Sequence, residues 1–166
     1  MRLNIRVTGP VLVFMLLAAP LVSAAGADLH WLWDNRCAEC HGHSGEFSRS
    51  NLRVVDRQLQ GRHHADDLRR FLGNHYLAGN DVDAIYNMLL AQAVSQARFK
   101  DECAGCHGSA AGFVRSSLEL CEGMLYGRNS GRPVDGFLSQ HMALGAADVV
   151  FYNNLLTRIA NEVYRQ

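Results

Sequence analysis

The feature that most constrains the fold of this 166-residue chain is an internal repeat. When Cys37 is aligned with Cys103 and the alignment is continued without a gap, twenty identical residues fall between position 37 and position 90. They include Phe71 with Phe137, His75 with His141, and Tyr86-Asn87 with Tyr152-Asn153. Such regular self-similarity is typical of a duplicated structural unit. We therefore expect two units of the same fold.

The most distinctive repeated segment reads Cys-Ala-x-Cys-His-Gly, and it occupies residues 37–42 and 103–108. Two thiols three residues apart on a helical turn face the same way, so they can form thioethers to the two vinyl groups of one porphyrin. The residue that follows can then turn its imidazole onto the iron. The pattern predicts two covalently bound haem c groups. Attachment would be through Cys37, Cys40, Cys103 and Cys106, with His41 and His107 as iron ligands.

Two other kinds of site also use paired cysteines. Two CxxC pairs can supply four thiolates to one structural zinc ion, but a zinc ribbon does not need the His-Gly that follows both pairs here. A thioredoxin-like redox pair would explain one CxxC and leave the second pair, its histidine and the missing βαβ pattern unexplained. We therefore retain the haem interpretation.

With these two motifs and the helical pattern around them, the chain resembles class I c-type cytochromes, and specifically their dihaem, tandemly duplicated members. The resemblance covers nearly the whole chain from residue 26 onward. It implies an all-α fold, made of two small cytochrome c-like helical haem units in tandem. We expect the first unit at residues 26–91 and the second at residues 92–166.

Each unit is predicted to consist of helices joined by loops. A helix carrying Trp31 and Trp33 should lead into the first motif, followed by a polar, Gly-rich loop. A short helix over residues 68–75 and a longer one from about residue 81 should complete the unit. Because no Gly or Pro interrupts residues 81–104, we expect this last helix to run almost directly into the second unit.

Units of about 66 residues are marginal for a core of their own, so the haem should itself form part of each core. Large apolar side chains at equivalent positions are the candidate walls. They are Trp33, Phe47, Phe71 and Leu72 in the first unit, and Phe99, Phe113, Phe137 and Leu138 in the second.

The sixth iron ligand decides whether such a haem passes electrons or binds a substrate. In typical class I cytochromes this ligand is a Met in a Pro-containing loop, and here no Met is placed equivalently in the two halves. Histidine is placed equivalently, because His75 and His141 are aligned in the repeat and each ends a Phe-Leu-x-x-His segment. We predict that His75 and His141 are the distal ligands.

Several other residues are candidate ligands or haem contacts. Met142 could replace His141 at the second haem, and Cys121, which aligns with Val55, could be a thiolate ligand or a small buried residue. Arg62 and Arg128 are duplicated and could pair with haem propionates. Three other histidines, His43, His63 and His64, have no counterparts in the second half and are interpreted as solvated surface residues.

Residues 1–25 have the layout of a secretory signal peptide, with early arginines, a short apolar run and small residues at its end. We expect export to the periplasm and no stable membrane insertion after cleavage, although an uncleaved anchor is the alternative. After residue 25 the chain carries sixteen acidic and fourteen basic side chains, so its formal charge is near −2. This balance does not favour nucleic acid as a partner.

These features predict an electron carrier with no catalytic residues, which passes electrons between a donor enzyme and an acceptor, both redox proteins. The alternative is a haem enzyme or enzyme subunit in sulfur-compound oxidation, whose support is the spare Cys121. A third possibility is a ligand sensor or carrier in which one haem is five-coordinate. It requires only that His75 or His141 does not bind iron.

Overall fold

The structure is a computed structural model, and it describes residues 26–165. The predicted signal peptide at residues 1–25 therefore lies outside the described residues. In the first half the elements are α1 (Leu29–Arg36), α2 (Ala38–His41), α3 (Ser44–Asn51), β1 (Leu52–Val55), β2 (Gln58–Gly61), α4 (Leu68–Gly73) and α5 (Asn80–Val94).

The second half repeats this order. Its elements are the π-helix η1 (Phe99–Cys103), α6 (Ala104–His107), α7 (Ala110–Ser117), β3 (Leu118–Cys121), β4 (Met124–Gly127), α8 (Val134–Leu138) and α9 (Ala146–Val163). From α6 onward every element begins at the position that the repeat aligns with the start of its counterpart. The sequence repeat is therefore a structural repeat, and only the segment before each motif differs in type.

The prediction of an all-α fold is wrong. Residues 26–165 are 59% helical and 12% strand, with two small antiparallel sheets of two strands each. β1 pairs with β2, and β3 pairs with β4, in segments that were predicted to be loops. The turn residues Asp56 and Arg57, and likewise Glu122 and Gly123, all have positive φ angles. Two such residues form the tight turn that matches the twist of a hairpin.

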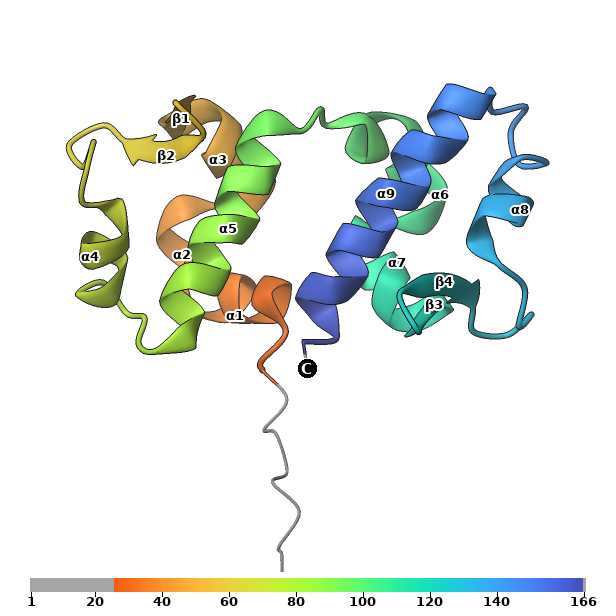
Figure 1. Cartoon of the computed structure of the whole chain (residues 1–166), viewed down its shortest axis with the longest axis horizontal. Helices are drawn as coiled ribbons and strands as arrows, with labels where there is room; N and C mark the ends of the chain where they lie inside the picture. The colour runs from red at the N-terminus through yellow and green to blue at the C-terminus, as the bar shows by residue number, and fades with distance from the viewer. Residues whose placement is uncertain (1–25, 166) are drawn as a thin grey trace, which may run out of the picture.

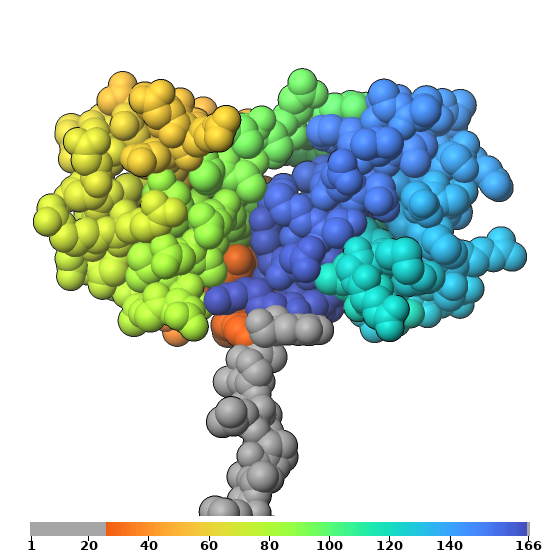
Figure 2. All heavy atoms as spheres, viewed as in Figure 1, coloured from red at the N-terminus to blue at the C-terminus, as the bar shows by residue number. Residues whose placement is uncertain are grey.

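Buried apolar side chains form two clusters, one drawn from residues 29–89 and the other from residues 99–163. Figure 1 shows the two halves side by side, with α5 and α9 near the centre and α4 and α8 at opposite ends. In the space-filling view the two halves meet along one seam (Figure 2). Each half thus has its own core, while the predicted boundary between residues 91 and 92 stays a prediction.

α5, the last helix of the first half, runs almost directly into the second half, as expected, but a short connection separates it from η1. α5 ends at Val94, and Ser95, its C-cap, adopts an extended conformation with φ −94° and ψ 146°. Serine favours helix ends because its hydroxyl competes for backbone hydrogen bonds. The chain then enters η1 after a short connection, so the halves are not held together by one rigid helix.

Polar contacts and a helix packing hold the halves together instead. α1 packs against α9. Asp28 binds Arg115 at 2.6 Å, and His30 lies 2.8 Å from Glu162. Arg165 reaches back to Asp81 at 2.8 Å. None of the described helices is long and apolar enough to cross a membrane.

Candidate haem-binding sites

The first Cys-Ala-x-Cys-His-Gly motif forms the single turn α2. Cys37 is its N-cap, and the Cys37 carbonyl accepts hydrogen bonds from the backbone N–H groups of Cys40 at 3.2 Å and His41 at 2.9 Å. Cys37 is half-buried, Cys40 is exposed, and both are free thiols. The two sulfur atoms therefore belong to one helical turn, as attachment to a single porphyrin requires. α6 repeats this arrangement with Cys103 and Cys106.

The glycine that ends each motif has a conformational role. Gly42 and Gly108 are the C-caps of α2 and α6, and both have φ +66°. Residues with a side chain rarely adopt this backbone conformation, which explains the glycine at the end of both motifs. In the first half the Gly42 carbonyl also accepts a hydrogen bond from Trp33 Nε1 at 2.9 Å. The equivalent Phe99 has no such donor.

The structure brings His41 and His75 together across the first half. α4 ends at Gly73, and His75 lies in the turn after it, where its backbone N–H donates to the Leu72 carbonyl at 3.0 Å. The His75 ring stacks on Phe71 with centroids 4.8 Å apart. Its centroid is 6.0 Å from that of His41.

The second half reproduces this pairing. His141 follows α8, donates its backbone N–H to the Leu138 carbonyl at 3.1 Å, and stacks on Phe137 at 5.0 Å. The centroids of His107 and His141 are again 6.0 Å apart. Histidines from distant parts of the sequence therefore become facing imidazoles in both halves, and no hydrogen bond joins the rings of either pair among the described residues.

This spacing can be tested against an iron ion with an imidazole on each side. With a metal–imidazole bond of about 2.0 Å and the ring centre roughly 1.1 Å behind the ligating nitrogen, one metal ion between two imidazoles places their centres roughly 6 Å apart. Both histidine pairs have this separation. The residues present therefore fit a haem held by histidine on both faces.

Burial and hydrogen bonds shift the pKa values of several groups in and beside these sites. It lowers the pKa of His41, and the neighbouring His75 lowers it further, so the neutral imidazole that binds metal is favoured. Burial raises the pKa of the Cys37 and Cys103 thiols. In the second half Glu102 stays ionised, because hydrogen bonds from Arg98 and the Tyr152 hydroxyl lower its pKa to about 2.

Seven of the eight predicted wall residues are buried or half-buried, and their contact with a haem stays a prediction. Trp33, Leu72, Phe99 and Leu138 are buried, and Phe47, Phe71 and Phe113 are half-buried. Phe47 and Phe113 contact His41 and His107, the predicted proximal ligands, with centroids 4.6 and 4.5 Å apart. Phe137 differs, because 59% of its surface is exposed. It still stacks on His141, as Phe71 stacks on His75.

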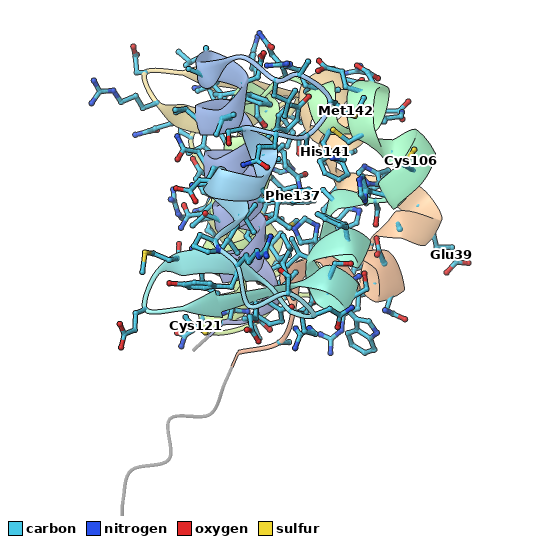
Figure 3. All side chains as sticks on the ribbon, turned by 90° about the vertical axis from the view of Figure 1, so that its right-hand side faces the viewer. Glu39, Cys106, Cys121, Phe137, His141 and Met142 are labelled. Carbon is cyan, nitrogen blue, oxygen red and sulfur yellow. The ribbon has the colours of Figure 1, made fainter. Side chains whose placement is uncertain are left out.

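The alternative ligands of the second half lie elsewhere. Cys121 is exposed at the end of β3, so the interpretation of Cys121 as a buried counterpart of Val55 is wrong. Figure 3 shows Cys121 at the far end of the unit from His141 and Cys106. Met142 follows His141 in the chain, but 70% of its surface is exposed. His141 is the residue that faces His107.

The two arginines proposed for haem propionates have different surroundings. The Arg128 guanidinium donates to the Leu118 carbonyl at 2.8 Å and to the Tyr164 hydroxyl at 3.0 Å, so it joins β3 to the end of the chain. Arg62 is exposed. A contact of either arginine with a propionate stays a prediction.

Not all the unduplicated histidines are simple surface residues. His43 is the N-cap of α3, where Nδ1 accepts the backbone N–H of Gly45 at 3.3 Å. His64 stacks on Phe71 at 4.1 Å and extends the column that ends at His75. His43 and His63 are exposed, whereas His64 is half-buried. No pattern in the sequence marked His64, because its counterpart in the repeat is a serine.

The duplicated tyrosines are structural residues whose role was not predicted. The Tyr86 hydroxyl accepts the backbone N–H of Leu59 at 2.7 Å and so ties α5 to the first hairpin. The equivalent Tyr152 hydroxyl donates instead to Glu102 Oε2 at 2.6 Å. Their identity at matching positions in the repeat was the available signal.

Within residues 26–165, no group of three or more His, Cys, Asp or Glu side chains gathers to hold a metal ion. The four motif cysteines therefore do not form the shared cluster that a structural zinc site would need. Comparisons with models of protein families, with curated proteins and with solved structures find no match to this chain.

Proposed function

We propose that this protein is a periplasmic electron carrier with two covalently attached haem c groups. Cys37 and Cys40 would hold the first haem, and Cys103 and Cys106 the second. The observation that carries the proposal is the pair of facing imidazoles in each half, 6.0 Å apart in both. Donor and acceptor would be other redox proteins, because no substrate needs to reach the iron.

The protein's own residues would keep both irons closed to small ligands. His41 and His107 lie beside Phe47 and Phe113, and the distal histidines are fixed by backbone hydrogen bonds and by stacking. When bound, a haem supplies one-electron chemistry, and imidazole on both faces gives a lower potential than a Met ligand. Export would agree with this chemistry, since in bacteria covalent haem attachment takes place outside the cytoplasm.

The alternative role in sulfur-compound oxidation depended on Cys121. Its exposed position, away from the paired histidines, gives that residue no contact with a haem site (Figure 3). No observation on the described residues favours this alternative over electron transfer.

The proposal is tested on protein exported with its haems. A pyridine haemochrome assay should find two haem c groups per chain, and the oxidised protein should show the near-infrared band of bis-imidazole iron. The reduced protein should not bind carbon monoxide. One haem or none, a thiolate band, or ready binding of carbon monoxide at both irons would contradict the proposal.

A further inference from the structure

A cavity of about 330 Å³ lies between the two halves, and Ala104 and Gly108 of the second Cys-Ala-x-Cys-His-Gly motif form part of its lining. Its walls come mainly from α1, α3 and α5 of the first half and from η1, α7 and α9 of the second. None of the four proposed iron ligands or the four motif cysteines lines it. The volume is within the range of pockets that hold small molecules.

Comparison of the two halves of the repeat shows that Arg49, at this cavity, lacks the carboxylate partner that its counterpart has. Arg49, on the cavity wall, is the counterpart of Arg115. Arg115 donates to both carboxylate oxygens of Asp28, at 2.6 and 3.1 Å. The residue equivalent to Asp28 in the second half is Val94, which cannot supply a carboxylate. Among the described residues Arg49 makes no ion pair, and its guanidinium has only a 3.5 Å contact with the Gln92 carbonyl.

The rest of the lining suits an organic anion. Lys100 adds a second cation, and its contact with Glu46 is long, at 3.5 Å, and exposed. Phe99, Leu155 and Ile159 supply an apolar wall. The buried Gln92 side chain also lines the cavity, and its Oε1 has no hydrogen-bond partner among the described residues. Because this amide oxygen accepts hydrogen bonds and an ionised carboxylate cannot donate one, a water molecule or a donor group elsewhere on the ligand would complete it.

We propose that this cavity binds a small organic carboxylate, whose two oxygens pair with Arg49 as those of Asp28 pair with Arg115. Arginine recognises a carboxylate through two parallel hydrogen bonds, whereas the ammonium group of lysine acts as a single point charge. The apolar wall would cover the body of the ligand. The inference does not depend on the proposed electron transfer, because the site contains none of the proposed haem ligands.

The test is isothermal titration of the exported, haem-containing protein with benzoate, compared with neutral benzamide and with sulfate. Benzoate should bind one to one, and benzamide and sulfate should bind at least roughly tenfold more weakly, which is about 1.4 kcal/mol. If benzamide bound as tightly as benzoate, pairing of the ligand's negative charge with Arg49 would be excluded. If sulfate bound as tightly as benzoate, a preference for organic anions would be excluded. No binding of benzoate would overturn the proposal.

Variants locate the site. Arg49→Gln should weaken benzoate binding by roughly tenfold. Arg53→Gln removes the same charge from an exposed side chain of β1 and should leave benzoate binding unchanged. Asp34→Asn removes the one acidic residue among the lining residues and should tighten binding.

The sharpest variant is Val94→Asp at the exposed position that corresponds to Asp28. The new carboxylate should occupy Arg49 and abolish binding of benzoate while thermal stability is retained. Equal weakening by Arg49→Gln and Arg53→Gln, or full binding in a folded Val94→Asp protein, would refute the assignment.

Discussion

His75 and His141, the proposed distal ligands, are positioned by two local contacts that recur in both halves. Each donates its backbone N–H to the carbonyl of the preceding leucine, and each ring stacks on the phenylalanine before that leucine. The short helix expected over residues 68–75 ends earlier, because α4 ends at Gly73. The turn after α4 still brings the His75 ring onto Phe71.

Replacing His75 with alanine should open the first iron. The expected result is a high-spin oxidised spectrum and carbon monoxide binding at half of the haems after reduction, because no other imidazole of the described residues faces His41. His141→Ala should have the same effect at the second iron, since Met142 is exposed and its backbone is fixed at φ +55°.

His63→Ala is the matched control, because His63 is an exposed histidine of the same half. It should leave the spectrum of the protein unchanged. If the His75 and His141 variants kept wild-type spectra and refused carbon monoxide, the paired histidines would not be the ligands.

At the scale of elements, the backbone conformation of the proposed haem motif can be tested by a substitution that changes none of the proposed ligands. Gly42→Ala should destabilise the protein by about 1–3 kcal/mol, because an alanine would have to adopt φ +66°. Nothing lies within 4 Å of the added methyl group, so the cost would come from the backbone alone. Urea unfolding measures it.

Gly105→Ala is the control for this substitution. Gly105 lies inside α6, has no positive φ, and also has open space around an added Cβ. Alanine is favoured over glycine within a helix by about 1 kcal/mol, so this variant should be neutral or slightly more stable. Equal destabilisation by both changes would show that the motif tolerates no side chain for another reason.

The hydroxyl that ties α5 to the first hairpin makes a second prediction at this scale. Tyr86→Phe leaves the buried backbone N–H of Leu59 without its partner, which should cost about 1–3 kcal/mol of unfolding free energy. Tyr152→Phe should cost less, because Glu102 keeps its hydrogen bonds to Arg98. A larger loss in Tyr152→Phe, measured by urea unfolding, would contradict this reasoning.

The helices and strands differ in how well the sequence predicted them. The helices before the motif and after each distal histidine follow from apolar periodicity, and the duplication predicted that both halves share one plan. The hairpins were missed because the turn of the first one, Asp56 and Arg57, carries no glycine. Glu122-Gly123 in the second half, between apolar segments, was the usable signal.

Other features could not be predicted because they depend on contacts between the halves. The cavity beside Arg49 exists only because α1 and α9 pack together, and no local pattern encodes that packing. The break between α5 and η1 is different, because Ser95, a residue type that favours helix ends, was a local signal for it. The histidine pairs were predictable because each half of the repeat has a histidine at both of the equivalent positions.

At the scale of the whole molecule, the separate cores predict that the two proposed haem sites form independently of each other. Replacing Cys37 and Cys40 together with alanine should remove the first haem only. Haem content by pyridine haemochrome should fall by half, and the N-terminal half should lose stability, because its core would lack the porphyrin. Unchanged haem content would refute attachment at these cysteines, and complete loss would show that the second site needs the first.

The ion pair between Asp28 and Arg115 should couple the halves. Asp28 also caps α1 by accepting the N–H groups of His30 and Trp31, and asparagine keeps that cap while removing the charge. Asp28→Asn, Arg115→Gln and the double variant form a cycle whose coupling should be roughly 0.5–1 kcal/mol. The exposed pair Arg69 and Asp83, within one half, should show almost none.

The same pair predicts how the coupling depends on pH. Burial alone would raise the pKa of Asp28, but the hydrogen bonds from Arg115 and from the backbone of Trp31 lower it below its usual value of 3.8. A carboxyl group with a lowered pKa stabilises the folded state above its ordinary pKa, and this contribution is lost as the pH falls through the lowered value. The stability difference between wild type and Asp28→Asn should therefore be constant near neutral pH and shrink below about pH 4. Urea unfolding at a series of pH values measures this difference, and a difference that persisted unchanged in strong acid would show that the Asp28 charge does not hold the two halves together.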